Sequence, residues 1–381
     1  MDKFDDLYRQ SIVDTRQFKN PETLSKVLDL AQKMEALCKL GDEYKFMQMT
    51  GRSKEKLEET RSMLEPLEKE LCFDKFPRKP IMISLFAQPS TRTRLSFESA
   101  MLRLRGEVFG SENAAEFSSF VKGETIEDAA NVMGRYGDVV VMRHKGDEKH
   151  PGNKVAVDFA NSCPAPMINA GAGTDQHPTQ SLLDVYTIRK EIGRLDNLKV
   201  AFVGDLRNGR TVRSLVFLLA QQKNNELYFV STDDYQLRLD MKVWLREKMR
   251  KTGVRFFEMG VSSLETILED IDVMYVTRLQ KEYEEGRENA AQSSAFMIKK
   301  KHLEKMKNSA IVMHPLPRID EIATDVDSDR RAAYFRQAQN GLYVRMALLH
   351  MVITGNHGIT GWEYNPEIAK KSYERSVSPD K

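Results

Sequence analysis

Residues 81–106 read IMISLFAQPSTRTRLSFESAMLRLRG and carry the clearest indication of the fold. The opening of this stretch, Ile81 to Phe86, is an apolar run suited to a buried strand. Apolar side chains then recur at helical spacing, at Phe97, Ala100, Met101 and Leu104. They predict a helix that begins near Ser90 and ends at Gly106. A strand, a short polar turn and a helix in direct succession are typical of an α/β domain.

The alternation of apolar runs and helical patterns continues along the chain. The run from Asp138 to Met142 predicts another buried strand, and a long helix is predicted from His177-Pro178 to about Gly193. Further apolar runs predict strands at Leu198–Val203, Leu227–Val230, Val254–Phe257, Ile271–Val276 and Ala310–Met313. A chain of 381 residues has room for two domains of ordinary size. We therefore predict an α/β fold with two parallel-sheet domains joined by interdomain helices.

Three other segments carry weaker patterns. Asn20-Pro21 marks the start of an amphipathic helix. From Glu43 to about Pro80 the composition becomes charged, and we expect a surface insertion in which Pro66 interrupts any helix. Near the C-terminus, Gly341 divides a helical pattern into two parts, and residues 357–381 form a tail to which we assign no function.

Charge and cysteine content exclude several classes of protein. Fifty-eight basic and 56 acidic residues leave a formal charge of +2, which argues against nucleic acid or a membrane as a partner. The three cysteines are widely spaced and predict neither a disulfide framework nor a zinc site: Cys38, Cys72 and Cys163. Residues 1–6 are acidic and resemble neither a secretory signal nor an Arg-rich transit peptide, and no stretch approaches the ~18 apolar residues of a membrane span. We therefore expect a cytoplasmic protein.

The turn Ser90-Thr91-Arg92-Thr93-Arg94 is the sharpest local signal for a binding site. It lies between the predicted strand and the predicted helix, where the first turn of the helix offers unpaired N–H groups and a partial positive charge. Two hydroxyls and an arginine at that place predict a phosphate site. The alternative is a purely structural turn, in which Ser or Thr caps the helix and the arginines are solvated.

Two other clusters combine histidine, proline and polar side chains. In His177-Pro178-Thr179-Gln180, a histidine and a glutamine share one face at a predicted helix start. Their side chains suit a group that presents both a carbonyl oxygen and an amide nitrogen. The segment His314-Pro315-Leu316-Pro317-Arg318 follows a predicted strand, and its prolines restrain the backbone carbonyls. Each cluster alone could also be a capping residue or a rigid turn.

Taken in order, the three clusters resemble the aspartate and ornithine carbamoyltransferase family. The resemblance covers residues 11–352, apart from the charged segment at 43–80. The aspartate branch is most similar, on Leu183-Asp184, Gly204-Asp205-Leu206, Asn208-Gly209-Arg210-Thr211, Thr277-Arg278-Leu279-Gln280 and Pro315 to Asp325. The ornithine branch has a cysteine where this chain has Pro315. The resemblance implies a transferase that forms N-carbamoyl-L-aspartate and phosphate from carbamoyl phosphate and L-aspartate, an early step of pyrimidine (UMP) biosynthesis.

The resemblance also implies roles for individual residues. The phosphate would be held by Ser90, Thr91, Arg92 and Thr93. The carbamoyl oxygen would be contacted by Thr93, Arg143 and His177, and its NH2 group by Gln180 and the backbone carbonyls of Pro315 and Leu316. The two carboxylates of aspartate would be bound by Arg210, Arg278, Gln280 and Lys122. No metal and no cofactor are implied.

Assembly and domain roles follow from the same resemblance. Ser118 and Lys122 are similar to the family's loop that reaches into the active site of a neighbouring subunit, which implies a homotrimer with shared sites. Regulatory chains are a further class of partner that the family allows. Residues 1–178 would bind carbamoyl phosphate, 179–330 would bind aspartate, and a helix at 331–356 would return to the first domain.

Other functions remain open at this point. Specificity can depend on a few contacts, so the chain could carbamoylate ornithine or another amine. It could also be a non-catalytic assembly partner of an active enzyme. A dehydrogenase is disfavoured, because residues 204–209 lack the closely spaced glycines of a dinucleotide-binding turn.

Overall fold

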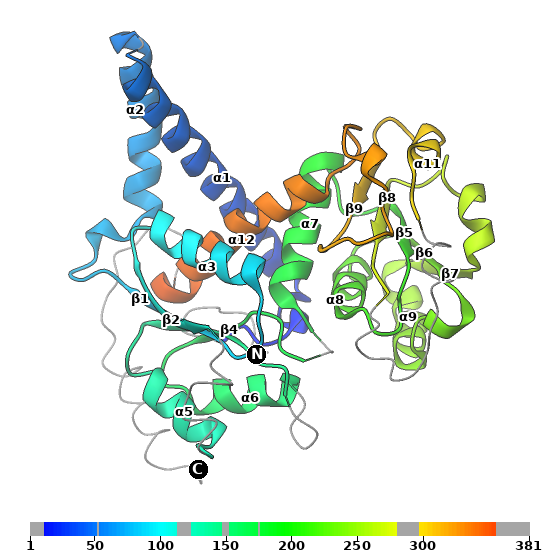
Figure 1. The fold of residues 1–381 in the computed structure, drawn as a ribbon, viewed down its shortest axis with the longest axis horizontal. Coiled ribbons are helices and arrows are strands. Elements are labelled where there is room, and N and C mark those ends of the chain that lie inside the picture. Colours follow the sequence, from blue (N-terminus) through cyan, green and yellow to red (C-terminus); the bar gives the residue numbers. More distant parts are fainter. Residues whose placement is uncertain are drawn as a thin grey trace. The chain divides into compact units, whose positions relative to one another are not determined.

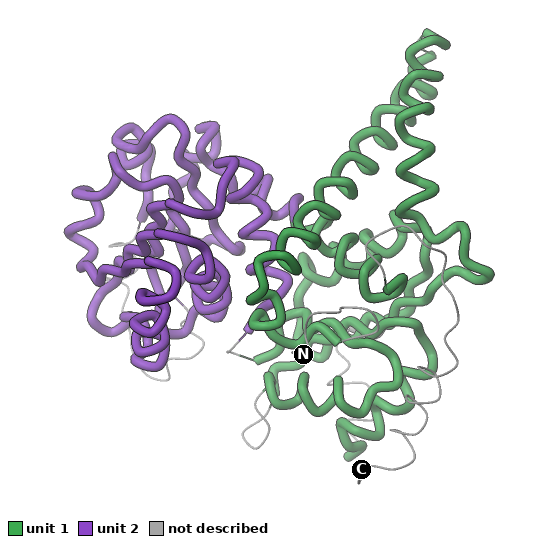
Figure 2. Tube along the Cα trace, turned by 180° about the vertical axis from the view of Figure 1, so that it is seen from behind, with its two compact units in different colours: residues 1–173, 341–381 green, residues 174–340 purple. Residues whose placement is uncertain are grey.

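The computed structural model describes residues 11–51, 53–112, 123–146, 152–173, 176–279 and 297–355. The chain divides into two compact units, residues 1–173 with 341–381 and residues 174–340 (Figure 2). Each unit is built on a sheet of parallel strands, which confirms the predicted α/β fold class. None of the helices in the described ranges has the length and apolar content to cross a membrane.

The sheet of unit 1 has the strand order β2-β1-β3-β4. The predicted strands are confirmed as β1 (Ile81–Phe86) and β3 (Val139–Arg143). The two flanking strands were not predicted, β2 (Glu107–Glu112) and β4 (Met167–Asn169). β2 begins and ends with glutamate and β4 has three residues, so neither forms an apolar run of strand length. Pairing with the central strands makes them extended.

Unit 1 also contains the helices α3 (Thr91–Arg103), α5 (Ile126–Met133) and α6 (Gly152–Ser162). Two 3-10 turns belong to it as well, η1 (Thr15–Phe18) and η2 (Phe73–Lys75). The core cluster that involves α5 and α6 includes Leu85, Ala130, Val140, Phe159 and Met167. Helix α1 (Pro21–Thr50) begins as predicted, because the Asn20 side chain accepts a hydrogen bond from the Glu22 N–H at 2.9 Å.

The charged segment after Glu43 is a helical hairpin, made of the second half of α1 and of α2 (Lys54–Leu71) (Figure 1). The expectation that Pro66 interrupts any helix there was wrong, because Pro66 lies inside α2. A proline removes one helical hydrogen bond, and here packing offsets that loss: α2 lies along α1 and buries Leu64. The ion pair between Arg61 and Glu68 also bridges the turns around Pro66, at 2.7 Å.

The C-terminal helical pattern forms one helix, α12 (Tyr334–Thr354), in which Gly341 makes no break. The break that the pattern placed at Gly341 was therefore wrong, and the single helix expected at 331–356 spans Tyr334–Thr354. Glycine costs roughly 1 kcal/mol in a helix interior relative to alanine. Burial of the side chains that follow exceeds this cost, including Tyr343, Val344 and Met346.

His350 of α12 is a buried histidine in the core of unit 1. Its ring stacks on Phe73 with a centroid distance of 6.0 Å, and its Nδ1 has no hydrogen-bond partner among the described residues. Burial lowers the pKa of His350 from 6.5 to about 4. The imidazole is therefore neutral in the folded protein at neutral pH.

This histidine predicts a loss of stability in mild acid. The unfolded chain binds the proton near pH 6.5 and the folded protein only near pH 4, so acidification between these values favours unfolding. We expect His350 to account for a loss of about 2 kcal/mol in the free energy of unfolding between pH 7 and pH 5. Urea titrations of the protein and of His350→Leu at both pH values measure it. The variant should lose that much less, and an equal pH dependence in both proteins would contradict the prediction.

The sheet of unit 2 has the order β7-β6-β5-β8-β9 (Figure 1). All five predicted strands are confirmed: β5 (Lys199–Val203), β6 (Glu226–Val230), β7 (Arg255–Met259), β8 (Val273–Val276) and β9 (Ile311–Met313). The helices are α7 (Pro178–Ile192), α8 (Arg210–Leu219), α9 (Leu239–Thr252) and α11 (Lys300–Glu304), with 3-10 turns η4 (Asp233–Tyr235), η5 (Val261–Thr266) and η7 (Thr324–Val326). Because all strands are parallel, the loops after their carboxyl ends share one edge of the sheet.

Candidate active site

The predicted phosphate turn lies between β1 and the first turn of α3. Ser90 occupies the N-cap position of α3, but its side chain makes no capping hydrogen bond. Thr91 and Arg92 are exposed, whereas Thr93 is buried. The purely structural alternative requires a capping hydroxyl, and Ser90 does not provide one. The helix start therefore keeps N–H groups and a partial positive charge for a ligand.

Arg94, which follows in the same turn, has a structural role. Its Nε donates to Glu98 Oε1 at 2.8 Å, and that oxygen also accepts from the Ser84 hydroxyl at 3.0 Å. The carboxylate of Glu98 therefore holds Arg94 along the helix surface.

Arg143 ends the strand next to β1, directly opposite Phe86. Its backbone oxygen accepts from the N–H groups of Ala87 at 2.9 Å and Gln88 at 3.2 Å, so it anchors the chain that leads into the phosphate turn. Its side chain is half-buried, and Nη1 donates to the Ala170 carbonyl at 3.4 Å. The structure therefore brings Arg143 and the phosphate turn to the same edge of the sheet of unit 1.

In unit 2, the loop after β5 is shaped by Gly204 and Asp205. Gly204 has φ +118°, and a Cβ there would lie 2.2 Å from the Thr277 carbonyl oxygen, so only glycine allows this approach to the end of β8. The buried carboxylate of Asp205 accepts from the N–H groups of Arg207 at 3.1 Å and Asn208 at 2.9 Å. These bonds order the loop that leads into α8, whose first residue is Arg210.

Arg210 and Arg278 emerge from neighbouring elements of this sheet edge. Strands β5 and β8 are paired in parallel, with Val203 opposite Val276, and Arg278 follows the end of β8. Both arginine side chains are half-buried. Two guanidinium groups at one sheet edge suit a dianionic ligand, because each can bind a planar carboxylate through two parallel hydrogen bonds.

His177 and Gln180 lie at the start of α7, as predicted, and both are buried. The His177 N–H donates to the Ser214 hydroxyl at 3.1 Å, which ties this helix start to α8. Gln180 Nε2 donates to Asp184 Oδ1 at 2.8 Å. The amide of Gln180 therefore has one fixed partner.

The third cluster forms a tight turn after β9. His314 Nδ1 accepts from the Leu316 N–H at 2.8 Å, and its Nε2 lies 2.7 Å from Glu321 Oε1. Leu316 has φ +49°, and its bond to Pro317 is cis. Burial lowers the pKa of His314. Burial opposes ionisation of Glu321, yet hydrogen bonds from His314 and from backbone N–H groups lower the pKa of this carboxyl. The neutral imidazole thus accepts at Nδ1 and donates from Nε2 to the Glu321 carboxylate.

Three of the predicted site residues, Ser118, Lys122 and Gln280, lie outside the described residues. The structure also adds polar groups that were not predicted as part of a site: Asp184, Asp205, Glu321 and Gln337. Asp184 follows Gln180 by one helical turn, so the spacing alone could have predicted a contact between their side chains. Gln337 contacts Asp184 from 153 positions away, which no local pattern indicates.

Comparisons with known proteins match both halves of the chain to one family. Residues 10–190 match the family described as aspartate/ornithine carbamoyltransferase, carbamoyl-P binding domain, and residues 196–352 match its Asp/Orn binding domain. The chain is 44% identical over 346 residues to the chloroplastic aspartate carbamoyltransferase of Oryza sativa, covering 90% of this chain and 85% of that protein. It is 43% identical over 307 residues to the aspartate carbamoyltransferase catalytic subunit of Methanocaldococcus jannaschii, covering 79% and 94%.

Solved structures are similar over nearly the whole chain. The catalytic subunit of M. jannaschii aspartate transcarbamoylase superimposes with a TM-score of 0.73 at 38% identity, covering 92% of this chain and 100% of that chain. Aspartate transcarbamoylase from Trypanosoma cruzi, in complex with N-(phosphonacetyl)-L-aspartic acid, gives a TM-score of 0.72 at 33% identity, covering 91% and 96%.

The expectation of a cytoplasmic protein was wrong. Relatives from Pisum sativum, Oryza sativa and Arabidopsis thaliana that cover most of the chain are named chloroplastic, at 50%, 44% and 44% identity. The expectation rested on few cysteines and on the first residues. Few cysteines are compatible with any reducing compartment, so this composition cannot tell one such compartment from another.

Proposed function

Because the chain belongs to the aspartate/ornithine carbamoyltransferase family, we propose roles for the polar side chains at the carboxyl edges of its two sheets. The chain is an enzyme with aspartate carbamoyltransferase activity: it transfers the carbamoyl group of carbamoyl phosphate to L-aspartate, in pyrimidine biosynthesis. The observation that carries the assignment of roles is the start of α3, where Ser90 leaves its capping position unused.

The phosphate of carbamoyl phosphate would bind at this helix start. Ser90, Thr91 and Thr93 would donate hydroxyl hydrogen bonds, and Arg92 would supply a charged bidentate contact. The backbone N–H groups of the first turn of α3 would point at the same oxygens. Phosphate leaves with negative charge, so the groups that bind the substrate would also stabilise the leaving group.

The carbamoyl group would be recognised at both of its polar ends. Thr93, Arg143 and His177 would contact its oxygen and stabilise the negative charge that develops when the amine attacks the carbon. Gln180 Oε1 and the backbone carbonyls of Pro315 and Leu316 would accept from its NH2 group. In the reaction the new C–N bond forms, the bond between carbon and the phosphate oxygen breaks, and the amine proton would leave with the phosphate.

Aspartate would be bound by Arg210 and Arg278, with contributions from Gln280 and Lys122. The support is the placement of both described arginines at the carboxyl ends of the paired strands of unit 2. Two cations match two carboxylates, whereas the side chain of ornithine would require an acidic partner.

The direct test is phosphate release from carbamoyl phosphate with L-aspartate, with L-ornithine, and with no amine. We expect release that depends on aspartate. Release that depends on ornithine would contradict the assignment of the amine site at Arg210 and Arg278. Release without any amine would show hydrolysis in place of transfer.

We also propose a homotrimer with shared active sites, in which Ser118 and Lys122 reach into the site of a neighbouring subunit. The support is the similarity of residues 117–124 to the family's loop. Regulatory chains would be additional partners, since relatives in Vibrio cholerae are named catalytic subunits. Sedimentation equilibrium of the purified chain tests the assembly, and a monomer mass at assay concentrations with full activity would contradict shared sites.

A further inference from the structure

We propose that Asp184 is a positioning residue that determines which atom of Gln180 faces the carbamoyl NH2 group. The inference rests on the proposed contact between Gln180 and carbamoyl phosphate. It adds a reason why that contact would favour a carbamoyl group over an acyl group that lacks the NH2.

The carboxylate of Asp184 is wholly buried and accepts from three side chains of unit 2. Its Oδ1 accepts from Gln180 Nε2 at 2.8 Å and from Gln337 Nε2 at 2.6 Å. Its Oδ2 accepts from the Tyr275 hydroxyl at 2.8 Å. Burial and the neighbouring Asp184 raise the pKa of Tyr275 well above its usual value, so the phenol stays protonated and donates.

An ionised carboxylate can only accept hydrogen bonds, and this property orients both amides. Gln180 and Gln337 must each turn their NH2 group toward Asp184. The opposite end of each amide is then an oxygen. In Gln337 that oxygen accepts from the backbone N–H of His314 at 2.9 Å, which agrees with this orientation of the amide. In Gln180 the oxygen is left to accept from an N–H donor.

The same carboxylate is linked to the turn after β9. Gln337 connects Asp184 to the His314 N–H, and the His314 imidazole in turn accepts from the Leu316 N–H at 2.8 Å. The carbonyls of Pro315 and Leu316 belong to this turn. All three proposed acceptors for the carbamoyl NH2 group are therefore held by one hydrogen-bonded network centred on Asp184.

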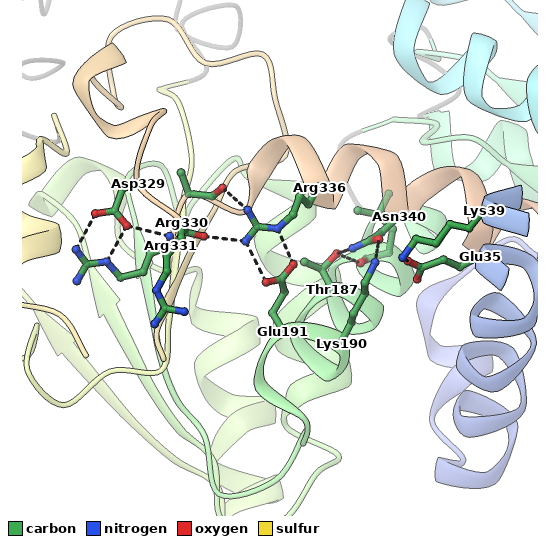
Figure 3. A network of polar contacts seen from close by, with 12 residues as sticks. Glu35, Lys39, Thr187, Lys190, Glu191, Asp329, Arg330, Arg331, Arg336 and Asn340 are labelled. Atoms are coloured by element: carbon green, nitrogen blue, oxygen red, sulfur yellow. Dashed lines mark hydrogen bonds and ion pairs between the residues drawn. The ribbon is translucent and has the colours of Figure 1, made fainter. Parts of the chain in front are cut away.

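A second row of contacts joins α7 to the first turns of α12 (Figure 3). Arg336 makes a bidentate pair with Glu191, at 2.8 and 3.0 Å. Asn340 Nδ2 donates to the Thr187 hydroxyl at 3.0 Å, and Lys190 Nζ donates to Asn340 Oδ1 at 3.2 Å. These contacts join the same two helices as the Asp184–Gln337 bond, but they use other residues and do not belong to the Asp184 network.

The functional consequence is selectivity for an NH2 group. Acetyl phosphate has a methyl group where carbamoyl phosphate has NH2, so it gains nothing from three oriented acceptors and leaves them without partners. If asparagine replaced Asp184, its amide could donate as well as accept. Gln180 could then turn over and present its own NH2 group to the substrate, which would repel the carbamoyl NH2.

The experiment measures selectivity as the inhibition constant of acetyl phosphate, competing with carbamoyl phosphate, divided by the KM of carbamoyl phosphate. We expect Asp184→Asn to lower this ratio by about tenfold or more, mainly through a higher KM for carbamoyl phosphate. The variant is nearly isosteric. Thr187→Val is the matched control, because it removes a buried hydroxyl from the same helix outside the Asp184 network. It should lower stability and leave the ratio within about threefold.

Three outcomes would overturn the inference. If Thr187→Val lowers the ratio as much as Asp184→Asn does, the effect is a general loosening of α7 and Asp184 has no special role. If Asp184→Asn keeps the ratio while Gln180→Ala lowers it, Gln180 recognises the NH2 group without help from Asp184. If the ratio is unchanged in Gln180→Ala, Gln180 does not contact the NH2 group, and the inference loses its premise. The activity itself is tested separately, by aspartate-dependent phosphate release in the unmodified enzyme.

Discussion

Replacement of Arg92 by alanine is expected to lower kcat/KM for carbamoyl phosphate by about 1,000-fold or more, which corresponds to roughly 4 kcal/mol of transition-state stabilisation. The side chain lies in the first turn of α3, where the N-cap hydroxyl makes no capping bond. It would hold the phosphate both in the bound substrate and as it leaves, so its loss should affect KM and kcat together. Aspartate-dependent phosphate release measures the effect.

Arg94→Ala is the matched control for Arg92→Ala. It removes an arginine from the same turn, but one that is paired with Glu98 at 2.8 Å. We expect kcat/KM to fall less than about tenfold in this variant, because a partly exposed ion pair contributes about 1 kcal/mol or less. A similar loss in both variants would mean that general basic charge, or damage to α3, explains the result, and the phosphate assignment would fail.

Arg210→Ala is expected to raise the KM for L-aspartate by about 100-fold, with a change of less than about threefold in the KM for carbamoyl phosphate. Arg210 is the first residue of α8, next to a loop that Asp205 orders through two N–H groups. A guanidinium in this place would bind one carboxylate of aspartate, and it has no proposed contact with the phosphate. Steady-state kinetics with each substrate varied in turn measures both constants.

The control for this second variant is Arg213→Ala, one turn further along α8. Arg213 is paired with Asp240, so its charge has a partner within unit 2. The KM for aspartate should change by less than about threefold in this variant. The assignment would be wrong if Arg210→Ala raised the KM for carbamoyl phosphate and left the KM for aspartate unchanged.

Much of the fold could be predicted from local patterns. The central strands of both sheets are apolar runs of strand length, because a parallel sheet covered on both faces buries nearly every side chain of its central strands. The starts of α1 and α7 were also predicted correctly, from Asn20-Pro21 and from His177-Pro178. These features depend on residues close together in the chain.

Part of the candidate site could be proposed from the sequence for a similar reason. Ser90, Thr91, Arg92 and Thr93 stand together at a helix start, and their chemistry suits a phosphate whatever surrounds them. The roles of Arg210, Arg278 and Gln280 came from resemblance to a family. Their positions in the sequence alone do not show that the loops after β5 and β8 share one edge of a sheet.

Features that depend on partners distant in the sequence could not be predicted from local patterns. α2 continues through Pro66 and α12 through Gly341, because packing offsets local helix propensities that differ by a few kcal/mol at most. β2 is a strand because β1 pairs with it. Local patterns therefore suffice to predict the α/β class, the order of the predicted elements and the place of the proposed phosphate turn. The contact between Asp184 and Gln337 could not be predicted, because the two residues are 153 positions apart in the sequence. Folding brings the Gln337 donor to the buried carboxylate, and a buried charge is stable only where such donors meet it.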